Sequence, residues 1–119
     1  MVIYKRDLDQ AREISEFGSR GALITPLVKL NADALVHRIR FDPHSLIGMH
    51  QAVGSQLFIV SEGSGWVRTN DEGKVYVSGG DMVYWMHGEW HESGTEQGMT
   101  VIIIEGQNPG QDVFSLPDT

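Results

Sequence analysis

The hydrophobic pattern of this chain is that of short β-strands separated by tight turns. Segments rich in Val, Ile, Phe, Tyr and Trp alternate with clusters of Gly, Asn, Asp, Ser and Pro. Short apolar segments at this spacing are typical of an antiparallel sandwich or barrel, so we expect an all-β fold. The predicted strands lie near residues 21–28, 34–41, 55–60, 64–69, 73–77, 82–86, 90–92 and 99–105.

One short helix is predicted near the N-terminus, at residues 7–16. Asp7 can cap its first turn and Gly18 can end it, with apolar residues at helical spacing between them. No linker, low-complexity segment or strong tandem repeat divides the sequence. We therefore expect one domain spanning residues 1–119.

Two of the predicted strands are apolar on both faces. In one of them Phe58 and Val60 face one way, while Leu57 and Ile59 face the other; residues 101–104 repeat this pattern. A sheet with one solvent-exposed face alternates apolar and polar residues, so both faces of these apolar strands must pack against other segments. A second copy of the chain could supply that cover, which predicts a homodimer. The alternative cover is the chain's own N-terminal segment.

Charge and composition exclude several classes of function. The formal charge is −7, and the nine basic residues are scattered, so no nucleic-acid partner is expected. No apolar run is long enough to span a bilayer, and the first residues do not resemble a signal peptide. The chain has no cysteine, which excludes disulfides, thiolate metal sites and a cysteine nucleophile. We expect a soluble cytoplasmic protein without a membrane partner.

A first group of residues keeps the spacing of a known motif, which runs Gly, five residues, His-x-His, three or four residues, Glu, six residues, Gly. Its first His falls on His50 and its final Gly on Gly63. The second His falls on Ala52, the Glu on Gln56 and the opening Gly on His44.

A second group matches a partner motif, which runs Gly, five residues, Pro-x-Gly, two residues, His, three residues, Asn. Gly80, Gly88 and His91 keep this spacing, while Met86 replaces the Pro and Thr95 the Asn. With these two groups of residues, the chain resembles a small single-domain cupin over about residues 34–105.

The resemblance implies a jelly-roll β-barrel, the double-stranded β-helix, that holds small molecules inside the barrel. Many cupins bind one divalent metal through three His and one Glu, and of these ligands only His50 and His91 survive here. Imidazole suits Zn, Ni, Fe and Cu, so the implied cofactor is a divalent transition metal of this group. Gln56 stands at the Glu position, where its amide oxygen is a neutral and weaker donor than a carboxylate.

His37 is a further candidate ligand, because it shares strand alternation with Leu35, Ile39 and Phe41 and so should face inward. The competing interpretation is a core histidine bonded to a backbone carbonyl or to water. His87, in a turn of the second motif, is expected to be a residue of the barrel mouth.

The expected lining of the barrel is aromatic, with the ligand-binding candidates Phe58, Tyr84, Trp85 and Trp90. The sequence leaves open whether Tyr84 or Trp85 faces inward on the strand near residues 82–86. The competing interpretation, plain core packing, explains most of these residues. A lining of rings with a few polar groups suits a small, partly apolar or planar molecule.

These residues favour a metal-dependent oxidoreductase or isomerase acting on an unidentified small molecule. The first alternative is a metal-free, non-catalytic cupin that binds or senses a small ligand. A metal-free enzyme with a histidine base and Tyr84 as its acid ranks third.

Overall fold

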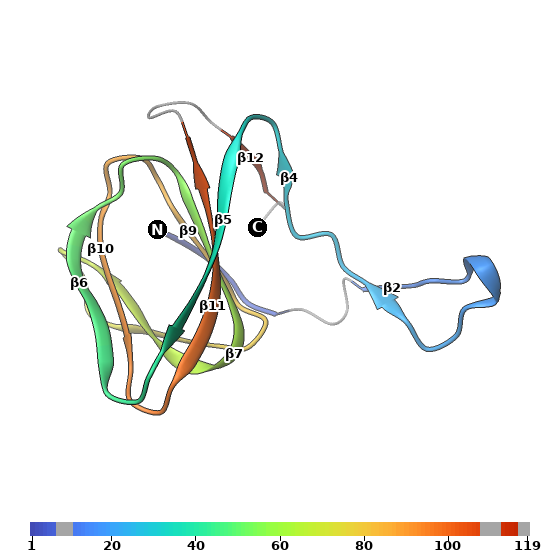
Figure 1. The fold of residues 1–119 in the computed structure, drawn as a ribbon, viewed down its shortest axis with the longest axis horizontal. Coiled ribbons are helices and arrows are strands. Elements are labelled where there is room, and N and C mark those ends of the chain that lie inside the picture. Colours follow the sequence, from blue (N-terminus) through green and yellow to red (C-terminus); the bar gives the residue numbers. More distant parts are fainter. Residues whose placement is uncertain (7–10, 108–112, 117–119) are drawn as a thin grey trace.

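The computed structural model describes residues 1–6, 11–107 and 113–116, and its main strands form a two-layered β-barrel (Figure 1). The first layer has the order β1 (Val2–Tyr4), β9 (Met82–Trp85), β7 (Gln56–Thr69), β11 (Met99–Gly106) and β5 (Ala34–Phe41). The second has the order β8 (Val75–Ser78), β7, β10 (Trp90–Thr95) and β6 (Ser45–Gln51). Neighbouring strands are antiparallel, and β7 belongs to both layers. This architecture confirms the all-β barrel expected from the sequence.

Four shorter strands lie outside the barrel layers. β4 (Lys29–Leu30) pairs with β12 (Phe114–Ser115) beside the barrel, and β2 (Arg12–Glu13) pairs with β3 (Leu23–Ile24). A 3-10 turn, η2 (Glu16–Gly18), lies between β2 and β3. Residues 11–27, which we call the arm, project away from the barrel (Figure 1).

The predicted N-terminal helix is wrong for the part of residues 7–16 that the structure describes. Residues 7–10 lie outside the described ranges, and from residue 11 onward the chain forms β2 instead. Ile14 N–H donates to the Ala22 carbonyl at 2.8 Å, so cross-strand bonds take the donors that a helix would use. Two further differences are that β6 was not predicted and that the segments 55–60 and 64–69 are one continuous strand.

The interior of the barrel is apolar. Phe58, Val83 and Trp85 of the first layer pack there with Val67 and Val77 of the second, and all five are buried. Among the described residues, no helix is long and apolar enough to cross a membrane.

The outer face of the first layer is covered by other segments of the same chain. Leu57 and Ile104 on this face are buried under Val113 and Phe114, together with residues around 28–34. The ring of Phe114 meets that of Tyr84 edge-on, with centroids 6.0 Å apart. The chain itself therefore covers much of the second apolar face from which the homodimer was predicted.

The bend that carries β7 from one layer to the other requires a glycine. Gly63 has φ +80°, and a Cβ built there would lie 2.3 Å from the carbonyl oxygen of Gly98. Any side chain would add backbone strain to a direct steric clash.

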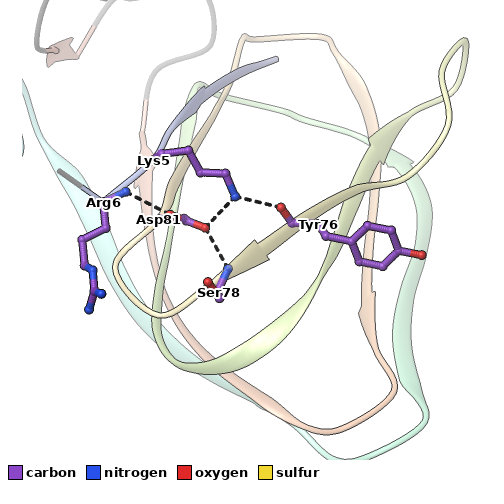
Figure 2. A network of polar contacts seen from close by, with 5 residues as sticks. All are labelled: Lys5, Arg6, Tyr76, Ser78 and Asp81. Carbon is purple, nitrogen blue, oxygen red and sulfur yellow. Dashed lines mark hydrogen bonds and ion pairs between the residues drawn. The ribbon is translucent and has the colours of Figure 1, made fainter.

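A buried carboxylate fixes the N-terminal segment to the turn before β9 (Figure 2). Asp81, 3% exposed, accepts hydrogen bonds from the backbone N–H groups of Arg6 at 3.0 Å and Ser78 at 2.8 Å. Lys5 Nζ donates to the same carboxylate and to the Tyr76 carbonyl, both at 3.0 Å. Burial alone would raise the pKa of Asp81, but the bonds from Arg6, Ser78 and Lys5 outweigh it and hold that pKa below its ordinary value.

Candidate metal and ligand site

The two histidines that survive from the motifs lie side by side. His50 on β6 is opposite His91 on β10 in the strand register, and their ring centroids are 4.3 Å apart. His91 is 2% exposed, whereas His50 is exposed. The pair thus connects the buried interior with the solvent.

Hydrogen bonds fix the same ring nitrogen in both histidines. Nδ1 of His50 donates to the Gly48 carbonyl at 2.7 Å, and Nδ1 of His91 donates to the Glu89 carbonyl at 3.1 Å. A carbonyl only accepts, so Nδ1 carries a proton in both rings, and Nε2 is the nitrogen that can offer a lone pair to a ligand. Within the described part of the chain, neither Nε2 has a hydrogen-bond partner. Histidines that bind metals are held in this way, by a bond from the non-ligating nitrogen.

The environment of His91 keeps its ring neutral. Burial lowers the pKa of His91 most strongly, and the nearby His50 lowers it further, against the opposing effects of the Glu89 carbonyl and carboxylate. The net pKa lies below the ordinary histidine value, so the ring is unprotonated at neutral pH and available as a ligand.

Trp85 forms the inner wall of the site. Its ring stacks on His91 with centroids 4.1 Å apart, and its other neighbour, Phe58, meets it edge-on at 5.2 Å. The indole Nε1 is buried and, alone among the buried side-chain polar atoms of the described residues, has no hydrogen-bond partner. An unpaired buried donor costs about 1–3 kcal/mol, which an acceptor oxygen on a ligand or a water would remove.

Gln56 lies on the inner face of the first layer, next to Trp85 in the register. Its Nε2 donates to Oε1 of Glu105 at 3.2 Å, which leaves the amide oxygen, the atom that binds metals, without a partner among the described residues. Sequence reasoning missed Glu105, although its alternation with Val101 and Ile103 could have indicated that it faces inward.

The prediction that His37 is buried on the inner face is wrong. It does pair with the buried Ile103, but its own side chain is exposed, because β5 is an edge strand paired only with β11 among the described strands. Among the described residues, it has no hydrogen bond or ring contact with His50 or His91.

The four aromatic candidates occupy different surroundings. Phe58 and Trp85 are buried inside the barrel, but Tyr84 faces outward onto Phe114. Of the two alternatives on this strand, Trp85 lines the barrel, and Tyr84 as a lining residue is wrong. Strand alternation turns it away, because its neighbour Trp85 takes the inner face. Trp90 is partly exposed beside His91.

Two loops, 52–55 and 86–89, form the rim of the site. They are joined by the N–H of Ala52, which donates to the Glu89 carbonyl at 3.0 Å, and by a contact of 2.5 Å between His87 Nδ1 and the Val53 carbonyl. His87 is therefore a rim residue, as expected. The exposed apolar side chains of this rim are Val53, Met86 and Trp90.

The donor set fits a metal only as a two-histidine site. Among the described residues, no group of three or more His, Cys, Asp or Glu side chains could hold an ion. His50 and His91 supply two imidazole nitrogens from rings 4.3 Å apart, and Gln56, opposite Trp85 in the register of the facing layer, offers a neutral oxygen donor. The remaining coordination positions would be taken by water or by a bound molecule.

Comparison with known proteins identifies the fold. A scan against protein-family models found no match, and a search of curated proteins found none either. Among solved structures, a cupin-like protein from Thermotoga maritima matches with a TM-score of 0.60 and 22% identity, over 67% of each chain. A protein with a double-stranded β-helix domain from Klebsiella pneumoniae matches with a TM-score of 0.58 and 18% identity, over 93% of each chain. A predicted oxalate decarboxylase from Thermotoga maritima matches with a TM-score of 0.54 and 22% identity, over 59% of this chain and 63% of its own. This chain therefore has the fold of a small cupin domain, the double-stranded β-helix.

Proposed function

We propose that the protein binds one divalent transition metal between His50 and His91, and a small molecule beside it in the barrel. The observation that carries the proposal is the matched pair of imidazoles, each held through Nδ1 with Nε2 left free. Two imidazole nitrogens from neighbouring rings, with no other partner in the described chain, suit Zn, Ni, Fe or Cu better than Mg or Ca.

Because the protein supplies only a few ligands, coordination positions on the ion stay open for chemistry. When bound, such a metal acts as a Lewis acid or a redox centre toward a molecule that takes an open position. Gln56 would supply a neutral oxygen rather than a carboxylate, so the site keeps more of the metal's positive charge than one that includes a glutamate. This charge favours an anionic or carbonyl-bearing molecule, as a metal-dependent oxidoreductase or isomerase would use.

The indole of Trp85 supports a ligand with an acceptor oxygen. Its unpaired N–H belongs to the same ring that stacks on His91. An oxygen-bearing ligand that accepts this hydrogen bond would be oriented next to the metal. Trp85→Phe keeps an aromatic ring against His91 but removes the donor, so it should weaken ligand binding more than metal binding.

A metal-free binding module is the second candidate. It is favoured by the absence, within the described residues, of a group of three or more His, Cys, Asp or Glu side chains that could hold an ion. In that case the two Nε2 atoms would accept hydrogen bonds from the ligand.

Metal content separates the two candidates. Protein purified without an affinity tag should contain one transition metal per chain by mass spectrometry, or take up one Zn²⁺ in calorimetry after chelator treatment. His50→Ala and His91→Ala should each weaken this binding by more than about tenfold, because each removes half of the imidazole pair. His44→Ala is the matched control, since His44 is exposed and, among the described residues, its side chain is hydrogen-bonded only to Glu96, at 2.8 Å.

The two candidates predict opposite results in this assay. Wild-type protein that binds none of the four metals would refute the metal site and favour the metal-free module. Equal losses of metal affinity in His44→Ala and His50→Ala would also refute the metal site, because the binding would then be nonspecific. Circular dichroism of each variant shows whether the barrel is intact.

A further inference from the structure

An open cleft lies on the outer face of the second layer, away from the interior of the barrel. Its volume is about 470 Å³, within the range of roughly 300–1,000 Å³ that small-molecule sites occupy. Val67 on β7 and Val77 on β8 pack into the interior, so strand alternation turns their neighbours Trp66 and Tyr76 outward, where both line the cleft. The histidine pair faces the interior and takes no part in this lining.

The two aromatic residues of the cleft have different roles. Trp66 and Tyr76 are cross-strand partners, but the ring of Trp66 lies over β10, since a Cβ built at Gly94 would be 2.5 Å from its Cζ2 atom. This ring is 6% exposed and leans away from β8, which leaves space beside it. Tyr76 is 68% exposed, and Figure 2 shows its side chain pointing away from the Asp81 network. Tyr76 therefore presents an aromatic face at the edge of the cleft.

Short polar side chains surround these rings. Ser64 and Ser78 are the next cross-strand pair on the same face, and Ser64 Oγ donates to Gln97 Oε1 at 3.3 Å. Within the described part of the chain, the amide nitrogen of Gln97 has no partner and stays available as a donor. Glu96 beside it contributes carboxylate oxygens as acceptors. The cleft thus combines hydrogen-bond donors and acceptors around an apolar surface.

The Asp81 network holds a donor at the same cleft (Figure 2). Lys5 Nζ donates to the Tyr76 carbonyl and to Asp81, both at 3.0 Å, and Lys5 also lines the cleft. An ammonium group has three N–H donors, so one remains for a ligand. Lys5 and Glu96 are the charged residues of the lining, and their charges cancel. The cleft therefore has no net charge with which to select a strongly charged molecule.

We propose that this cleft binds a sugar ring. The C–H face of a pyranose stacks on Tyr76, because the face of an aromatic ring carries negative partial charge. Sugar hydroxyl groups both donate and accept, which matches the mixed set of Lys5, Gln97 and Glu96. An anion such as phosphate would meet the carboxylate of Glu96, and an apolar molecule would leave the polar groups unpaired. The site is separate from the histidine pair and does not depend on the function proposed above.

Nuclear magnetic resonance with a panel of sugars tests the site. The ¹⁵N-labelled protein is titrated with glucose, galactose, mannose, N-acetylglucosamine and cellobiose, and separately with inorganic phosphate. At least one sugar should shift the indole N–H of Trp66 and the amides of Tyr76 and Gln97 in a saturable way, while the indole N–H of Trp85 stays unchanged. No saturable shift with any of the sugars would overturn the proposal. Shifts centred on Trp85, or tighter binding of phosphate than of every sugar, would overturn it too.

Substitutions of Tyr76 test the stacking surface. Tyr76→Ala should weaken binding of that sugar by more than about tenfold, and Tyr76→Phe by less than about threefold, because the phenyl ring keeps the aromatic face. Phe17→Ala is the matched control, since Phe17 is a 98% exposed aromatic residue of the arm and lies outside the cleft. Circular dichroism verifies that each variant is folded. Wild-type affinity in Tyr76→Ala, or an equal loss of affinity in Phe17→Ala, would overturn the proposal.

Discussion

Replacing Asp81 should destabilise the barrel strongly, although the residue is not one of the two central histidines. Its carboxylate accepts two backbone hydrogen bonds while almost fully buried, and a hydrogen bond to a charged group contributes about 1.5–3 kcal/mol. Lys5 adds little, because its side chain is mostly exposed. We therefore expect Asp81→Ala to lower the free energy of unfolding by about 3 kcal/mol, and Asp81→Asn by about half of that, since one amide oxygen remains.

Urea unfolding followed by circular dichroism measures this loss. In a domain of this size, about 3 kcal/mol corresponds to a fall of about 12 °C in melting temperature. Asp71→Ala is the matched control, because Asp71 is exposed and has no hydrogen bond or ion pair among the described residues. The control should unfold within about 0.5 kcal/mol of the wild type.

The stabilisation that Asp81 contributes should be lost in acid and kept at neutral pH. The folded-state pKa of Asp81 lies below the unfolded value, so its stabilisation is fully present above about pH 4. As the pH falls through the folded pKa, the carboxylate becomes protonated and the stabilisation is lost. The difference between wild type and Asp81→Asn should therefore shrink in acid. A difference below about 0.5 kcal/mol at pH 7, or one that grows toward pH 2, would refute the reasoning.

Three further substitutions test other parts of the structure. Gly63→Ala should lower the free energy of unfolding by more than about 2 kcal/mol in urea titration, whereas Gly73→Ala, which has open space for a Cβ, should change it by less than about 0.5 kcal/mol. Phe114→Ala should lower it by about 3 kcal/mol in thermal unfolding, because it uncovers the outer face, while the solution mass stays unchanged. Gln56→Glu should tighten Zn²⁺ binding by about tenfold in chelator competition, since it adds a charge at short range; equal affinities would show that this position does not face the ion.

The fold was predictable because its signals are local. Strand alternation, turn residues and the spacing between motif positions are all properties of short stretches of sequence. The same spacing predicted that His50 and His91 would meet, since motif register determines which residues lie opposite each other on β6 and β10. A glycine such as Gly63 keeps its place in the motif because the bend excludes any side chain.

The errors arose where the outcome depends on distant parts of the chain. Alternation correctly placed His37 on the face of Ile103, but no local signal shows that β5 is an edge strand and leaves this side chain exposed. For Tyr84 the alternation was ambiguous, because its strand is apolar on both faces, and the ring that covers it, Phe114, comes from the far end of the chain. In the arm, helical spacing of apolar residues was outweighed by cross-strand pairing between β2 and β3.

The shared strand β7 has a consequence for how the protein unfolds. Its first half pairs with β9 and β11, and its second half with β8 and β10, so one continuous backbone segment is central to both layers. Neither layer can open without breaking hydrogen bonds along this strand. The amide protons of β7 should therefore exchange with solvent only through global unfolding, at nearly the same rate in both halves. The wall bearing Trp85 and the wall bearing the two histidines would then be lost together, in one cooperative transition.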